Sequence, residues 1–199
     1  MRLLELFSGT GSVGDVFREH GWSVLSLDRD MPADIQMDIM AWDYREYQPH
    51  TFDFVWCSPP CTEYSVAKTV GTRRLEEANA IVRRTLEILR YFDPPYWAIE
   101  NPQSGHLKRQ EFMVDLPYYD LDYCCYGMPY RKRTRLWGVL GWWMPRPLCR
   151  WDCPYADGVR HYYTAQQRSR ETVRGTGRAI SIVCPVNLLT RYCARCDTG

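Results

Sequence analysis

Short apolar runs and helical patterns alternate along the first hundred residues of the chain. Four runs are almost continuously apolar, as in strands buried on both faces: 2–7, 22–28, 52–57 and 96–102. Residues 12–21 and 73–92 have the spacing of amphipathic helices instead. In the second of these, the apolar stripe consists of Leu75, Ala78, Val82, Leu86 and Leu89. The alternation predicts an α/β fold with a mostly parallel sheet and helices on both of its faces.

The pattern changes after residue 115. The segments YYDLDYCCYGMPY (118–130) and TRLWGVLGWW (134–143) predict two late strands that form an antiparallel pair at the sheet edge. Residues 144–179 are rich in Pro, Gly, Arg and Cys and have little periodicity, and a short helix is expected from Pro185 to Cys196. These changes divide the chain into a main domain (1–140), a short irregular region (141–177) and a C-terminal segment (178–199) that packs back on the main domain.

Length and composition favour one intracellular domain. A chain of 199 residues can bury a single core, and it has no apolar run of 18 residues that would span a membrane. The N-terminus lacks the small-residue cleavage site of a signal peptide, and nine cysteines are an odd number. We therefore expect a monomer in a reducing compartment, the cytoplasm or the nucleus, with thiols that serve catalysis or bind metal.

Charge is distributed unevenly along the chain. Residues 1–100 have a net charge of −6 and residues 101–199 a net charge of +7, although the whole chain has only +1. Of the 25 basic residues, 22 are arginines. Because arginine forms bidentate contacts with phosphate and guanine, the second half favours a nucleic-acid-binding face, with a plain bias of composition as the alternative.

A glycine-rich loop follows the first predicted strand. The spacing Phe7-x-Gly9-x-Gly11 is not the dinucleotide fingerprint, and no phosphate-binding Lys-Ser/Thr follows it. Asp28 ends the second strand, where a carboxylate can accept hydrogen bonds from ribose hydroxyls, and Asp38 follows within reach of an adenine amino group. In this order the elements favour S-adenosylmethionine, with its carboxylate on amides near Thr10 and Ser12; a plain tight turn is the alternative.

A thiol and a carboxyl group follow two neighbouring predicted strands. Cys61 comes directly after Pro59-Pro60, and Glu100 opens the sequence Glu-Asn-Pro; both lie at the carboxyl ends of strands, where open α/β sheets bind ligands. A thiolate that adds to C6 of cytosine, with a protonated glutamate on N3, makes C5 nucleophilic enough to accept a methyl group. An isolated cysteine after Pro-Pro would more often be structural, but the pairing with Glu100 favours this chemistry.

Five segments together resemble the ordered motifs of DNA (cytosine-5) methyltransferases. They are LLELFSGTGSVG, SLDRD, DFVWCSPPCTEYS, YWAIENPQSG and YGMPYRKRTRLWG, and they span about residues 2–138. The resemblance implies a Rossmann-like class I methyltransferase fold, with Cys61 as the nucleophile and Glu100 as the partner of cytosine N3. Residues 1–140 are then the catalytic and cofactor-binding domain. The implied cofactor-binding residues are Phe7, Ser8, Gly9, Thr10, Gly11, Ser12, Asp28, Arg29, Asp38, Ile39 and Pro59.

The family's Gln-x-Arg-x-Arg motif corresponds to RKRTR. It implies catalytic roles for Arg133 and Arg135, although Arg131 stands where glutamine is usual and the alignment could be off by one residue. Arg131, Lys132 and Arg168 are then candidates for nucleic-acid contacts, and a run that only holds phosphates is the alternative. Family members usually have a recognition domain of about a hundred residues, whereas only 141–177 would serve here. Segment 178–189 also lacks the family's Gly-Asn. We therefore expect a short recognition sequence, relaxed specificity or a helper protein.

The irregular region also contains candidate metal ligands. Cys149, Cys153 and His161 could bind zinc if Cys193 or Cys196 supplied the fourth ligand. The spacing is not that of a standard zinc finger, and free buried cysteines remain the alternative.

The preferred hypothesis is methylation of cytosine C5 in double-stranded DNA, on a base that is flipped out of the helix. The same chemistry on RNA or on a free cytosine nucleotide is one alternative, and a non-catalytic, zinc-stabilised DNA-binding remnant is another. Host-defence protection, genome marking by a virus and gene regulation all fit the preferred hypothesis.

Overall fold

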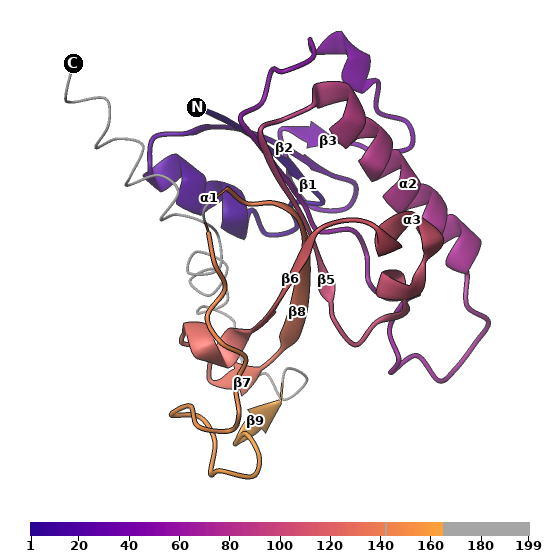
Figure 1. The fold of residues 1–199 in the computed structure, drawn as a ribbon. Helices are drawn as coiled ribbons and strands as arrows, with labels where there is room; N and C mark the ends of the chain where they lie inside the picture. The colour runs from indigo at the N-terminus through magenta and orange to yellow at the C-terminus, as the bar shows by residue number, and fades with distance from the viewer. Residues whose placement is uncertain (142, 165–199) are drawn as a thin grey trace, which may run out of the picture.

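The computed structural model describes residues 1–141 and 143–164 and contains a seven-stranded sheet (Figure 1). The strand order is β3-β2-β1-β4-β5-β8-β6. The parallel strands are β1 (Arg2–Leu6), β2 (Ser23–Asp28), β3 (Ile35–Gln36), β4 (Phe54–Cys57) and β5 (Tyr96–Pro102). The antiparallel strands at the far edge are β8 (Arg133–Val139) and β6 (Tyr118–Asp122). The predicted mostly parallel sheet with a late antiparallel edge pair is therefore confirmed.

Helices cover both faces of this sheet (Figure 1). On one face lies α1 (Ser12–Glu19), and on the other lies α2 (Leu75–Phe92), with the short α3 (Glu111–Val114) beside it. The predicted apolar stripe of α2 packs into one of two hydrophobic clusters, and α1 packs into the other through Val13 and Phe17. The two predicted helices and both of their faces are thus confirmed, with α2 ending at Asp93 in a left-handed conformation (φ 42°).

Several short elements differ from the sequence expectations. The predicted strand 118–130 is a strand only as far as Asp122 and continues as the 3₁₀ helix η3 (Tyr123–Tyr126). Two-residue β3 escaped prediction because it is too short for a periodic pattern. A further pair, β7 (Tyr130–Arg131) and β9 (Tyr163–Thr164), forms a small parallel sheet at the lower end of the molecule in Figure 1. Other 3₁₀ turns are η1 (Tyr44–Glu46) and η2 (His106–Arg109). The expected helix from Pro185 to Cys196 lies outside the described residues.

None of the helices in the described part of the chain is long and apolar enough to span a membrane.

A buried carboxyl group lies between β1 and α1. Glu5 is 2% exposed, and its Oε2 accepts a hydrogen bond from the backbone N–H of Gly14 at 3.1 Å. Position 14 must be glycine for this close approach, because a Cβ there would collide with the same oxygen. Burial raises the pKa of Glu5 to about 7, against the smaller lowering effects of Gly14 and Arg18. The folded state therefore favours the protonated acid.

We expect Glu5 to make the protein less stable as the pH rises. Below the unfolded-state pKa both states are protonated; between that value and about 7 only the unfolded state ionises, which lowers the free energy of unfolding by up to about 3 kcal/mol above pH 7. Glu5→Gln can still accept the Gly14 hydrogen bond but cannot ionise. Urea unfolding at about pH 5 and about pH 8 should show a smaller loss of stability in the variant than in the wild type. Equal losses in both proteins would contradict this assignment.

Candidate active site

Loops from four parallel strands meet at the carboxyl edge of the sheet. The glycine loop follows β1, Asp28 ends β2, the Pro-Pro-Cys segment follows β4 and Glu100 lies near the end of β5. Strands β4 and β5 are direct neighbours, with Cys57 paired to Ile99, so the segments that carry Cys61 and Glu100 leave the sheet side by side. The edge predicted to hold the ligand therefore gathers the main candidate residues.

The Pro-Pro-Cys segment presents its second cysteine and packs the first. Cys57 is fully buried in the core, whereas Cys61 is exposed. The buried side chain of Asn101 donates a hydrogen bond from Nδ2 to the carbonyl of Pro59 at 2.9 Å, which ties the Glu-Asn-Pro strand end to this loop. The N–H of Tyr64 donates to the carbonyl of Cys61 at 3.1 Å. Two loops from neighbouring strands thus fix the backbone on either side of the thiol.

Three polar groups surround the position of this thiol. Glu100 Oε1 accepts hydrogen bonds from Lys132 Nζ at 3.1 Å and from the Tyr123 hydroxyl at 3.3 Å. Partial burial and the negative charge of Glu100 raise the pKa of the Cys61 thiol, and the positive charge of Lys132 acts against them. Desolvation opposes the charge on Lys132, but the Glu100 carboxylate outweighs it, and the pKa of Lys132 lies above its ordinary value. Cys61, Glu100 and Lys132 are therefore electrostatically coupled.

The two arginines expected in catalytic roles contact the edge strand. Arg133 forms two hydrogen bonds with the fully buried carboxylate of Asp122 (3.0 and 2.7 Å), and Arg135 forms two with Asp120 (2.7 and 2.8 Å). Each pair is directly opposite across the β6–β8 ladder. Arg131 also donates to Asp122, at 3.2 Å. The contacts of all three arginines described here are thus with β6.

Lys132 lies beside Glu100 because successive side chains of a strand point to opposite faces of a sheet. Glu100 pairs with Leu136, and positions 132, 134 and 136 share its face. Arg133 and Arg135 share the other one. Sequence reasoning had placed Lys132 among nucleic-acid contacts; a one-residue difference in register decides which basic residue reaches Glu100.

A second cavity, of about 210 Å³, opens beside the glycine loop. Its walls combine apolar side chains with carboxylates, and they include five of the predicted cofactor-binding residues: Phe7, Asp28, Arg29, Asp38 and Ile39. Pro60 lines the cavity, whereas the predicted Pro59 is buried. Apolar walls with carboxylates at the rim fit an adenosyl group, whose ring is flat and whose hydroxyl and amino groups are donors.

The glycine loop is held against the end of β2. Phe7 has a positive φ of 61°, which turns the chain at the end of β1, and the N–H of Gly9 donates to Asp28 Oδ2 at 2.8 Å. Asp28 Oδ1 accepts from the next two backbone amides of its own loop, both at 2.9 Å. The predicted Ser8, Thr10, Gly11 and Ser12 complete the turn that leads into α1. Ser8 Oγ is buried and has no hydrogen-bond partner among the described residues, which leaves it available to a ligand.

The candidate metal ligands Cys149, Cys153 and His161 lie together, as expected. The fourth group beside them is Cys124 of η3, and the side-chain ligand atoms of all four lie within 4.8 Å of one another. Sequence reasoning missed Cys124, although its Cys-Cys pair could have drawn attention to it. Cys193 and Cys196 lie outside the described residues.

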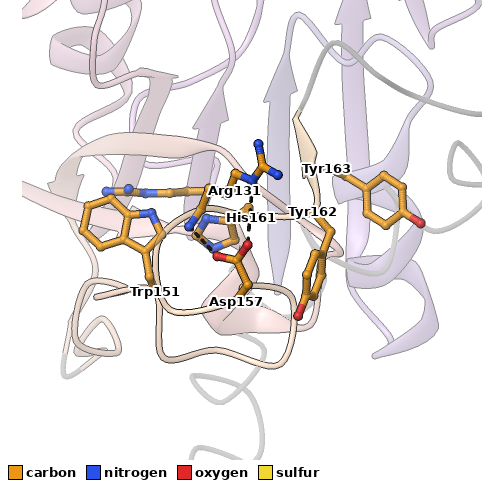
Figure 2. A pocket seen from close by; sticks show the side chains of 7 residues that line it. Arg131, Trp151, Asp157, His161, Tyr162 and Tyr163 are labelled. Atoms are coloured by element: carbon orange, nitrogen blue, oxygen red, sulfur yellow. Dashed lines mark hydrogen bonds and ion pairs between the residues drawn. The ribbon is translucent and has the colours of Figure 1, made fainter.

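A wide hollow of about 760 Å³ lies next to this cluster (Figure 2). It is lined by Arg131, Trp151, Asp157, Arg160, His161, Tyr162 and Tyr163. Figure 2 shows Trp151 on one side and the two tyrosines on the other, and the guanidinium of Arg131 lies 4.8 Å from the Trp151 ring centre. Arg168, the other predicted nucleic-acid contact, lies outside the described residues.

The comparisons with known proteins agree with this geometry. No protein-family model matches the chain. A probable DNA (cytosine-5)-methyltransferase of frog virus 3 (isolate Goorha) is 36% identical over 170 residues, which are 77% of this chain and 78% of the viral protein.

Two solved structures have a similar fold. A candidate DNA modification methyltransferase encoded within an E. coli prophage superposes with a TM-score of 0.56 at 16% identity, over 75% of this chain and 52% of its own. The Entamoeba histolytica methyltransferase EhMeth superposes with a TM-score of 0.53 at 13% identity, over 71% and 53%. The chain thus spans about half the length of these two proteins, and the likeness to them concerns the fold. The identity to the viral protein covers more than two thirds of both chains, and on this basis the chain belongs to the DNA (cytosine-5)-methyltransferase family.

Proposed function

We propose that the protein transfers a methyl group from S-adenosylmethionine to C5 of a cytosine in DNA, through a covalent bond between the Cys61 sulfur and C6 of the base. The observation that carries this proposal is the exposed thiol of Cys61 beside Glu100, across the ends of two neighbouring parallel strands. The cavity that fits an adenosyl group opens on the same edge, with Pro60 as a shared wall.

In the proposed first step, the Cys61 thiolate adds to C6 of the base. Electrons move toward N3, to which a protonated Glu100 donates its proton, and C5 acquires the character of an enamine carbon. Lys132 and Tyr123 both contact Oε1 of Glu100, so Oε2 is the oxygen that we expect to reach N3. The chain thus activates C5 by holding a sulfur and a proton on opposite sides of one ring.

S-adenosylmethionine supplies an electrophilic methyl group to C5. Loss of the C5 proton then expels the Cys61 thiolate and restores the C5–C6 double bond, and Glu100 regains its proton from N3. In this scheme Lys132 stabilises the thiolate in both its attacking and its leaving form, because its charge lowers the pKa of Cys61. Arg133 and Arg135 position the β6 edge through Asp122 and Asp120.

We further propose that the described part of region 141–177 contacts DNA. The hollow of Figure 2 combines two arginines, Arg131 and Arg160, with three aromatic side chains, which suits phosphates and unstacked bases. A cytosine must leave the duplex for C6 to meet Cys61, and aromatic groups beside the site could stack on the bases that remain. This surface is small for a recognition region, which favours a short target sequence or a helper protein.

The proposal is tested by incubating the protein with S-adenosylmethionine and unmethylated duplex DNA, single-stranded RNA or free cytidine nucleotides. Nucleoside mass spectrometry should detect 5-methyldeoxycytidine in the duplex reaction above the other two. A product only in RNA or only in the nucleotide would replace DNA as the substrate. No product from any of the three, with cofactor bound, would contradict turnover by this chain alone.

Cofactor binding should depend on Asp28. Asp28→Asn removes the negative charge but keeps one oxygen to accept the loop amides, and we expect the affinity for S-adenosylmethionine to fall by roughly 10- to 100-fold, the scale of a lost hydrogen bond to a charged group. Isothermal titration calorimetry measures this directly. Asp53→Asn is the matched control, because Asp53 bonds to the N–H of Arg2 away from the cavity. An unchanged affinity in Asp28→Asn would contradict the ribose-binding role.

A further inference from the structure

Four potential metal ligands converge below the sheet edge. The Sγ atoms of Cys149 and Cys153 lie 3.5 and 3.3 Å from Nε2 of His161, and the ligand atoms of all four residues, Cys124 included, lie within 4.8 Å of one another. Tetrahedral zinc with ordinary bond lengths requires sulfur–nitrogen separations of about 3.6 Å and sulfur–sulfur separations of about 3.8 Å. We propose that Cys124, Cys149, Cys153 and His161 bind one Zn²⁺ ion in a closed structural site.

The ligands come from two parts of the chain that need a cross-link. Cys124 belongs to η3, which directly follows the edge strand β6, whereas the other three belong to the irregular segment 144–162. That segment contains neither helix nor strand, and its internal pairing includes the single bridge between Ala156 and His161. A segment with so little secondary structure gains most from a metal that closes it.

Other contacts position the segment on the same turn. The backbone N–H of Cys149 donates to Asp122 Oδ2 at 3.1 Å, and the Tyr155 hydroxyl donates to the carbonyl of Gly127 at 3.0 Å. Both contacts flank η3 on its two sides. They place Cys149 against Cys124 without any metal bond, which pre-organises the pair for a shared ion.

Four groups of this kind are better explained by a metal than by disulfides. Three thiols can form only one disulfide among themselves, which would leave a cysteine and the imidazole without a purpose in their convergence. A Cys₃His set with all four groups on one point is a common structural zinc site, and it needs no open position for chemistry. Its role here is to fix the walls of the hollow in Figure 2, which His161 itself lines.

The test is the metal content of the full-length protein, purified under reducing conditions without chelators and measured by inductively coupled plasma mass spectrometry. The wild type should contain about one equivalent of zinc per chain. Cys124→Ser should lose most of it, whereas Cys125→Ser, the matched control at the next position, should keep it. The double variant Cys193→Ser/Cys196→Ser should also keep it.

Two readouts guard against a variant that fails to fold. X-ray absorption at the zinc edge of the wild-type protein should report three sulfur neighbours and one nitrogen neighbour. Chelator treatment of the wild type should lower its melting temperature, and added zinc should restore it. A metal-free wild type that is folded, a disulfide among the three cysteines, or zinc lost from the Cys193/Cys196 variant but kept in Cys124→Ser would each overturn the proposal.

Discussion

Cys61→Ala should reduce methyl transfer by at least roughly 10³-fold, the scale on which the loss of an essential nucleophile falls. Without the adduct at C6, C5 of cytosine has no electron density to attack a methyl group, and no other described thiol lies at this edge of the sheet: Cys57 is buried in the core and the other described cysteines gather near η3. Cofactor affinity should be unchanged, since Cys61 does not line the adenosyl cavity.

Single-turnover rates with duplex DNA and calorimetry with S-adenosylmethionine separate these two effects. Cys125→Ala is the matched control, because it removes a thiol of intermediate burial near η3. Retention of more than about a tenth of the wild-type rate in Cys61→Ala would contradict the nucleophile assignment, since a group required in the transition state is worth far more than tenfold.

Glu100→Gln should lower the rate of the chemical step by roughly 10²- to 10⁴-fold, the range of general acid catalysis by a positioned side chain. A glutamine amide can still donate a hydrogen bond to N3, but it cannot deliver a proton as the adduct forms. The binding of duplex DNA should change little. Rapid-quench measurement of the methylation step, together with the dissociation constant for DNA, distinguishes loss of chemistry from loss of binding.

The neighbouring basic residues provide the comparison for this variant. Lys132→Met removes the charge that lowers the pKa of Cys61, so the thiol pKa rises and the ascending limb of the rate–pH profile moves to higher pH. Arg133→Met removes a partner of Asp122 on β6 and should leave that limb in place. A shift in Arg133→Met but not in Lys132→Met would contradict the role given to Lys132 and favour the arginine implied by the family motif.

The sequence was sufficient to predict features that depend on local pattern. The buried runs, the stripe of α2 and the placement of Cys61 and Glu100 at strand ends follow from periodicity and from the rule that parallel strands expose one common edge. The five predicted residues around the adenosyl cavity were accessible for the same reason, because they follow β1 and β2 directly.

Features that depend on register or on distant contacts were not accessible. The face on which Lys132 lies is fixed by the pairing of β8 with β5, and one residue of slip would exchange it with Arg133. Cys124 joins ligands that follow it by 25 to 37 positions, and no local pattern connects them. Asn101 lay within a quoted motif, but its bond to the Pro59 carbonyl is a tertiary contact.

The central claim is a covalent bond between Cys61 and C6 of cytosine, and a duplex that carries 5-fluorocytosine tests it most directly. Fluorine occupies the position from which a proton must leave, so the methylated adduct cannot be released and should accumulate. Intact mass spectrometry with S-adenosylmethionine present should show protein plus one oligonucleotide strand plus one methyl group, and peptide mapping should place the bond on Cys61. An adduct on another residue, or methylation of ordinary DNA without any trapped adduct, would contradict the account.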